Sequence, residues 1–114
     1  MFRYTRLDAL GEGRGLLMIL SFADRGTSDL FNRVDSKSAR RTCPPDVWPV
    51  AQRKLDQINA AVSLTSLAFP PGNRLEALRG NRAGQYSIRV SGQWRVSFNW
   101  TSAGPASVAV VDYH

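Results

Sequence analysis

The chain of 114 residues contains one cysteine, one histidine and no long hydrophobic run. A single cysteine cannot form an internal disulfide, and the sequence has no CxxC pair or histidine-rich spacing that would hold a metal. No stretch reaches the roughly 18 consecutive apolar residues that a membrane span needs. These absences exclude a disulfide-stapled secreted fold and a helical membrane protein, and they favour the cytoplasm.

Acidic residues are fewer than basic ones, and lysine is much rarer than arginine. Lys and Arg number 15 against nine Asp and Glu, a formal net charge of +6, and 13 of the 15 are arginine. The planar guanidinium fork suits bidentate phosphate contacts better than the point charge of lysine. We therefore expect an anionic partner, the alternatives being solubility charge or neutralisation by an acidic protein.

The chain has the length and composition of one folded domain. Hydrophobic residues make up 43%, which provides enough apolar surface for a modest core. Residues 1–17 show no amphipathic period, and their charged residues exclude a signal peptide. We predict a mobile N-terminal extension over residues 1–17 and a single domain over residues 18–114, with Met18 as a candidate natural start.

The apolar pattern predicts a strand and two helices in the first half of this domain. The run Met18–Ala23 is typical of a strand. Thr27 is the predicted cap of a short helix whose apolar face extends to Val34, and residues 36–42 form a polar, basic linker. Asp46 is the predicted cap of a second helix with an apolar stripe. The stripe consists of Trp48, Ala51, Leu55, Ile58 and Val62, at spacings of three and four.

The second half of the domain predicts an antiparallel meander. Apolar and polar residues alternate over 86–90 and 94–100, which are joined by a loop at Ser91–Gln93 in which Gly92 is free to take a positive φ. Residues 108–111 are apolar on both faces, which indicates a central strand. Together the elements predict an α+β sandwich with helices on one face of the sheet and arginines on the other.

Two arginines are expected to face each other across the predicted hairpin. The apolar faces of its strands coincide when paired residue numbers sum to an even value, and the three-residue loop that meets this condition places Arg89 directly opposite Arg95. Like charges across a sheet repel unless an anion lies between them. The pair is therefore a candidate phosphate cradle, and the alternative is that both side chains splay into solvent.

Four motifs of the chain occur together in one known family. They are the opening run Met18–Phe22, the block Arg74–Gly84, the triplet Trp94–Val96 and the terminal Asp112-Tyr113-His114. On these motifs, residues 18–114 resemble the HigB-type toxins of bacterial type II toxin–antitoxin modules, within the RelE/ParE superfamily. The resemblance implies a small RelE-like fold, in which an N-terminal strand and two helices pack on an antiparallel β-sheet meander.

The resemblance also implies an activity. It is that of a cytoplasmic, ribosome-dependent mRNA endoribonuclease, or mRNA interferase, that inhibits translation. The chemistry would be metal-independent attack of a ribose 2′-OH on the adjacent phosphate, without a cofactor. The implied partners are a HigA-like helix-turn-helix antitoxin, the ribosome and mRNA, with operator DNA contacted only through the antitoxin and no membrane. A second class stays open, a non-enzymatic ParE-like toxin or binding module acting on gyrase or another protein.

The C-terminal motif carries the predicted acid–base chemistry. His114 can exchange a proton near neutral pH, although a lone histidine at a chain end can also be a solvated side chain. Asp112 lies on the same strand face and would orient the imidazole. In a regular strand Tyr113 points to the other face, so its use in the site, which the family implies, would need a twist or bulge. Core packing is its alternative role.

Arginine forks supply both charge and geometry to a phosphorane-like transition state. Arg79, Arg82 and Arg95 are candidates for direct phosphate contacts, and Arg74 and Arg89 for peripheral contacts to RNA or the ribosome. Any of them could instead belong to a solvated face.

Glu76 stands where some family members carry a catalytic histidine. A carboxylate can act as a base, but its usual pKa is low. The replacement therefore puts in doubt a mechanism in which two histidines transfer the protons. The predicted site therefore has catalytic residues His114, Asp112, Tyr113, Glu76, Arg79 and Arg95, RNA-binding residues Arg82, Arg89 and Arg74, and no metal.

Overall fold

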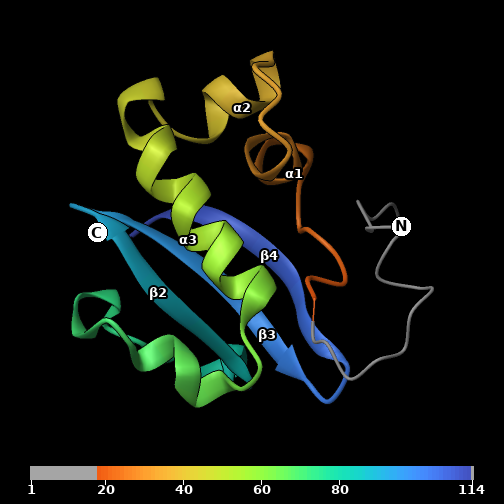
Figure 1. The fold of residues 1–114 in the computed structure, drawn as a ribbon, viewed down its shortest axis with the longest axis vertical. Helices are drawn as coiled ribbons and strands as arrows, with labels where there is room; N and C mark the ends of the chain where they lie inside the picture. Colours follow the sequence, from red (N-terminus) through yellow and green to blue (C-terminus); the bar gives the residue numbers. More distant parts are fainter. Residues whose placement is uncertain (1–17, 114) are drawn as a thin grey trace.

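A computed structural model of the chain describes residues 18–113. The predicted extension over residues 1–17 and the candidate His114 both lie outside the described residues. The described part has the predicted α+β architecture, with helices packed on a four-stranded antiparallel sheet of order β1-β2-β3-β4 (Figure 1). Within it, no helix is long and apolar enough to cross a membrane.

The secondary structure divides into a helical first half and a β second half. The helices are α1 (Arg25–Phe31), α2 (Lys37–Thr42) and α3 (Trp48–Ala60), and the strands are β1 (Glu76–Ala77), β2 (Gln85–Ser91), β3 (Trp94–Thr101) and β4 (Gly104–Asp112). Short 3₁₀ helices connect them: η2 (Pro45–Val47), η3 (Leu64–Ala68), η4 (Pro71–Asn73) and η5 (Gly80–Arg82).

The predicted cap of the first helix is wrong. Asp24 caps α1 by accepting a 2.7 Å hydrogen bond from the Thr27 amide. Thr27 itself is fully buried, and its Oγ1 accepts the N–H of Val110 in β4 at 3.0 Å. The helix ends at Phe31, so Val34 falls outside it and is exposed. The Thr27 hydroxyl therefore bonds α1 to β4 and does not cap the start of α1.

The residues predicted as a linker form a helix instead. Ser36 caps α2 by accepting from the Ala39 amide at 3.0 Å, and Ala39 is fully buried. A short polar segment is helical here because it packs on α1. Gly26 of α1 makes that close approach possible, since an added Cβ would overlap Thr42 Oγ1 and lie 2.5 Å from the Ser38 carbonyl oxygen.

Helix α3 carries most of the predicted apolar stripe. Ala51, Leu55 and Ile58 are fully buried. The predicted Asp46 cap is wrong, because Asp46 lies inside η2 and α3 begins at Trp48 without a side-chain cap. The stripe also ends early: α3 stops at Ala60, and Val62 is 69% exposed.

The predicted first strand is only partly formed. Phe22 makes an isolated parallel bridge to Val108, and the amides of Leu20 and Ala23 bond to carbonyls of Pro105 and Val108 at 2.8 and 2.9 Å. The segment follows β4 without a regular ladder. Strand β4 is therefore last in the sheet order and not central as predicted, but this segment covers part of its outer edge.

The register of the β2–β3 hairpin is as predicted. Arg89 lies opposite Arg95, and Gly92 has a φ of 52°. The loop is shorter than predicted, because the strands extend to Ser91 and Trp94 and a bulge between Arg89 and Ser91 adjusts the pairing.

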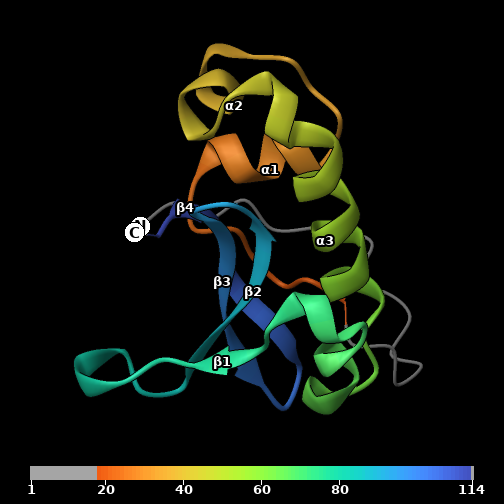
Figure 2. The same cartoon turned by 90° about the vertical axis from the view of Figure 1, so that its left-hand side faces the viewer.

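The two faces of the sheet differ in chemistry. One row across β2, β3 and β4 contains Ile88, Val96 and Val110, which are buried in the core beneath α3. Figure 2 shows α3 along this face, while none of the described helices covers the opposite face. The opposite face carries polar side chains, among them Ser87 and Arg95. The alternation of the strands thus gives the sheet a polar face that none of the helices α1, α2 and α3 covers, called the open face below.

The contact between α1 and α2 gives a stability test. Gly26→Ala should lower the free energy of unfolding by about 1–3 kcal/mol, because the added Cβ collides with a backbone carbonyl that cannot move alone. Urea titration of the purified protein measures this change. Gly72→Ala is the matched control, since nothing lies within 4 Å of its added Cβ. Equal free energies of unfolding for the two variants would show that α2 shifts to accommodate the added Cβ without loss of stability.

Candidate active site

A buried arginine lies on the open sheet face, near the start of β3. Arg95 is 7% exposed. Its Nε donates to Ser87 Oγ at 2.8 Å, and one terminal nitrogen, Nη2, donates to the carbonyl oxygens of Arg74 at 2.5 Å and Ser87 at 3.2 Å. A buried charge is tolerated only when it is paired and hydrogen-bonded. These bonds therefore explain how the cation can sit within the fold.

Two predicted site residues surround this guanidinium. Glu76 Oε1 lies 3.8 Å from Arg95 Nη2, and the side chain of Glu76 is 53% exposed. On the C-terminal side, the guanidinium carbon lies 5.6 Å from the centroid of the Tyr113 ring, within cation–π range. The structure thus brings together a carboxylate, a cation and a phenol.

The strand register explains this convergence. Glu76 pairs with Ser87, and Arg95 pairs with Val111, so all four lie on neighbouring rows of one face. Tyr113 follows Val111 by two residues and therefore shares its face without the predicted twist or bulge. Its amide also bonds to the Gln93 carbonyl at 2.6 Å.

Asp112 is not part of this cluster. It pairs with Trp94, whose side chain packs against the core on the α3 side of the sheet. Alternation therefore places Asp112 on the opposite face from Tyr113 and Arg95. Its predicted partner, His114, lies outside the described residues, so their pairing stays a prediction.

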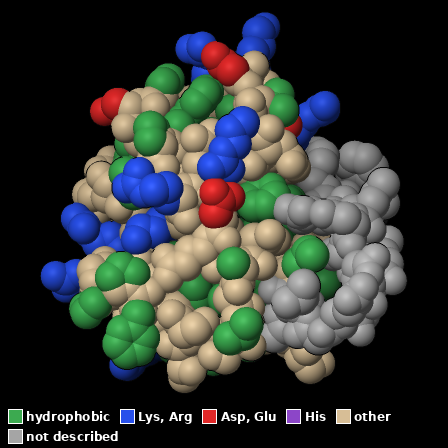
Figure 3. Space-filling view, in the orientation of Figure 1, with side chains coloured by type: hydrophobic (Ala, Val, Ile, Leu, Met, Phe, Trp, Pro, Cys, Tyr) green, Lys and Arg blue, Asp and Glu red, His purple; other side chains and the backbone are tan. Residues whose placement is uncertain are grey.

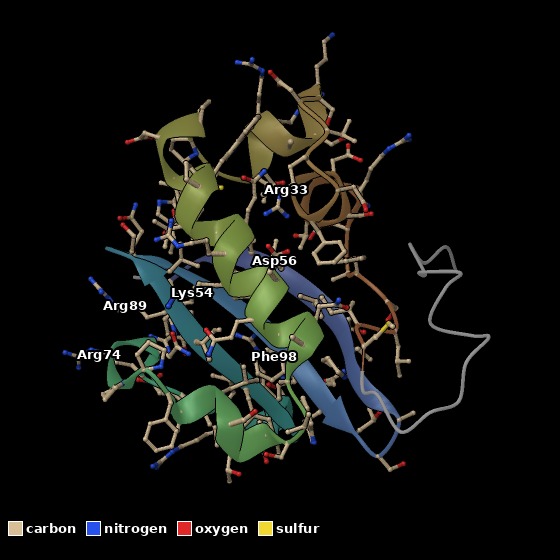
Figure 4. The ribbon with its side chains drawn as sticks, viewed as in Figure 1. Arg33, Lys54, Asp56, Arg74, Arg89 and Phe98 are labelled. Carbon is tan, nitrogen blue, oxygen red and sulfur yellow. The ribbon has the colours of Figure 1, made fainter. Side chains whose placement is uncertain are left out.

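Arg74 and Arg89 form an exposed basic rim beside this cluster. Figure 4 shows both side chains at the same edge of the molecule, and in Figure 3 Lys and Arg side chains gather there. Arg89 is exposed although its backbone faces that of the buried Arg95. A phosphate that contacts Arg89 and Arg95 equally would require the Arg95 guanidinium to break its hydrogen bonds to Ser87 and the Arg74 carbonyl.

Arg79 and Arg82 lie on the loop between β1 and β2. Both are exposed, and Arg82 Nε donates to Gln85 Oε1 at 3.2 Å. Gly80 and Gly84 have φ values of 69° and 91°, which only glycine adopts readily, as expected for a loop shaped by glycines. Figure 2 shows this loop projecting from the body. These two exposed cations lie away from the body of the domain and are not packed against Arg95.

The hydrogen bonds of Arg95 limit how it can bind a phosphate. A guanidinium has five N–H groups, of which three already serve Ser87 and the Arg74 carbonyl. The two that remain are on a single nitrogen, Nη1. A phosphate could therefore receive bonds from one nitrogen, and a fork-like contact would require the present bonds to break.

The single cysteine is not a reactive thiol. Cys43 is buried, and this burial, followed by nearby Asp46, raises the pKa of its thiol to about 11, so it is a poor nucleophile. Among residues 18–113 no group of three or more His, Cys, Asp or Glu is placed to hold a metal ion.

Sequence reasoning missed Ser87, Asn73 and Lys54. Ser87 is buried and holds Arg95; the alternation of β2 places it on the correct face, but a serine carries no signal by itself. Asn73 and Lys54 meet across 19 residues, a contact that no local pattern indicates.

Comparison with known proteins places this chain in a class. Residues 20–114 match the family model described as the RelE-like toxin of the type II toxin–antitoxin system HigB. Toxin HigB-1 of Vibrio cholerae is 35% identical over 97 residues, which cover 85% of this chain and 98% of that toxin. An uncharacterized protein of Haemophilus influenzae is 39% identical over 57 residues, 50% of this chain and 56% of its own length.

The class is therefore that of type II toxin–antitoxin toxins. More particularly, the chain belongs to the HigB-like toxin family. A toxin of this type is paired with an antitoxin, which is its partner.

The bonding of Arg95 gives a prediction for two charge-conserving variants. Arg95→Lys should lower the free energy of unfolding by about 1–3 kcal/mol and weaken growth arrest, because one ammonium cannot bridge Ser87 and the Arg74 carbonyl. Arg74→Lys should change neither, since Arg74 contributes its carbonyl to this contact. Urea titrations and growth curves at matched expression measure both effects. Equal behaviour of the two variants would contradict the structural role of Arg95.

Proposed function

We propose that this HigB-like toxin is a ribosome-dependent mRNA endoribonuclease. The observation that supports it most directly is the buried Arg95 with Glu76 and Tyr113 beside it on the open sheet face. A protein that acted only by binding would not require a buried cation beside a proton acceptor and a phenol. The exposed arginines around this cluster add a field that attracts a polyanion.

The proposed reaction needs proton transfer at two atoms. The ribose 2′-oxygen attacks the adjacent phosphorus while Glu76 accepts its proton. The bond from phosphorus to the 5′-oxygen breaks, and His114 donates a proton to that leaving oxygen. The products are a 2′,3′-cyclic phosphate and a 5′-hydroxyl. The reaction written in this way uses only side chains of the protein and needs no metal or cofactor.

The cations have two separate tasks in this proposal. Arg95 stabilises the charge that develops on the phosphate through its remaining Nη1 donors. Arg74, Arg79, Arg82 and Arg89 hold the RNA or the ribosome from the exposed rim and the projecting loop. Tyr113 keeps the guanidinium in place through its ring.

The proposed partner protein is a HigA-like helix-turn-helix antitoxin. The net charge of +6 favours an acidic surface on it, and operator DNA would be contacted only through the antitoxin.

Ribosome dependence is the first test. Purified protein should cut mRNA within codons on translating ribosomes and cut naked RNA poorly, because the ribosome supplies the positioning that a sparse site lacks. The new ends should carry a 2′,3′-cyclic or 3′-phosphate. A 2′-deoxy nucleotide at the cleaved position should abolish the cut, and one placed a codon away should not. Growth arrest without any RNA cleavage would favour the ParE-like alternative instead.

The second test concerns the chain end. His114→Ala should reduce single-turnover cleavage on ribosomes by about 10²–10⁴-fold, the usual contribution of a general acid or base. Antitoxin binding should stay unchanged. Ser102→Ala, in the exposed turn between β3 and β4, is the control. A rate within a few-fold of the control would remove His114 from the mechanism.

A further inference from the structure

Asn73 is a fully buried amide that joins α3 to the loop before β1. Its Oδ1 accepts a 2.5 Å hydrogen bond from Lys54 Nζ of α3. Its Nδ2 donates to the carbonyl of Leu67 at 3.0 Å and lies within bonding distance of the Phe69 carbonyl and of Gln57 Oε1. Both ends of the amide are thus satisfied, the Oδ1 by Lys54 of α3 and the Nδ2 by carbonyls of the preceding loop.

The residue after Asn73 has an unusual backbone. Arg74 is in the left-handed region, with φ 47° and ψ 58°, which non-glycine residues adopt only when their surroundings enforce it. Its amide bonds to the Pro71 carbonyl at 3.1 Å, and the amide of Asn73 bonds to Pro70 at 2.9 Å. The buried Asn73 side chain fixes the start of this turn.

The same turn aims the Arg74 carbonyl at the site. That carbonyl accepts from Arg95 Nη2 at 2.5 Å. The path from α3 to the site therefore has three contacts: Lys54 to Asn73, Asn73 to Arg74 through the backbone, and Arg74 to Arg95. Figure 4 shows Lys54, Arg74 and Arg89 on one side of the molecule.

Lys54 is suited to this place. Burial, followed by the charge of nearby Arg53, lowers the pKa of its ammonium group, so bonding to Asn73 compensates a cation that has lost water.

We propose that Asn73, anchored by Lys54, is a positioning residue that fixes the guanidinium of Arg95 in the orientation required for RNA cleavage. The step to cleavage rests on the proposed nuclease function, whereas the effect on the position of Arg95 does not. Asn73 touches no reacting atom and acts through the Arg74 carbonyl.

The test substitution is Asn73→Asp. It keeps the size of the side chain and the acceptor for Lys54, but a carboxylate cannot donate to the carbonyls of Leu67 and Phe69. Asn81→Asp makes the same chemical change at an exposed residue of η5 and controls for the added charge. Lys54→Met is a milder third variant, since it removes only the ammonium that holds Asn73.

The first measurement is made on the full-length free toxin. The buried Nε–H of Arg95, bonded to Ser87 Oγ, should give a slowly exchanging signal in proton–nitrogen NMR. Asn73→Asp and Lys54→Met should accelerate its exchange by about tenfold or more, the change expected when a local bond opens more often. Asn81→Asp should leave it unchanged. Unchanged Arg95 exchange in folded Asn73→Asp or Lys54→Met protein would overturn the proposal.

The second measurement is single-turnover cleavage on ribosomes. The maximal rate should fall by about tenfold to a hundredfold for Asn73→Asp, with half-saturation by ribosomes unchanged, as expected for a misplaced catalytic group. A normal rate despite altered Arg95 exchange would remove Asn73 from the reaction. If Asn73→Asp does not fold, Lys54→Met decides both measurements. If the wild type cuts no RNA, the nuclease proposal fails, and the NMR result still decides whether Asn73 positions Arg95.

Discussion

The burial of one guanidinium is the constraint on which this fold and its site depend. Taking a charge out of water costs several kcal/mol unless partners replace the lost hydration. For Arg95 these partners come from β1, β2, the turn before β1 and the chain end: Glu76, Ser87, the Arg74 carbonyl and Tyr113. Segments that are separated in the sequence are thus joined through one polar group on the open face.

The division of the sheet into two faces explains how so small a domain can both fold and present a site. The α3 side supplies the core, where Leu55, Ile58, Ile88 and Val96 are fully buried. The other side is free to hold a cation, because stability does not depend on covering it with a helix. Around it, exposed arginines create a positive field that suits an anionic partner.

Helix α3 contributes more than its apolar stripe. Through Lys54 it holds the buried Asn73, and through Asn73 it determines where the turn at Arg74 lies. Packing and site geometry are therefore coupled, since a shift of α3 on the sheet would move the carbonyl that orients Arg95. Such coupling makes residues remote from the reacting atoms candidates for influence on rate.

The sequence by itself determined the α+β class, the family, the apolar stripe of α3 and the pairing of Arg89 with Arg95, because these follow from periodicity, motifs and the two-residue repeat of strands. It also indicated Glu76, Tyr113 and Arg95. Only the tertiary structure decided that Arg95 is buried while Arg89 is exposed, that Tyr113 and not Asp112 shares its face, and that Thr27 binds β4 instead of capping α1. The physical reason is that a buried charge or hydroxyl forms hydrogen bonds with whichever groups folding brings near it. Lys54 and Asn73, for example, are 19 residues apart, and no local sequence pattern predicts their contact.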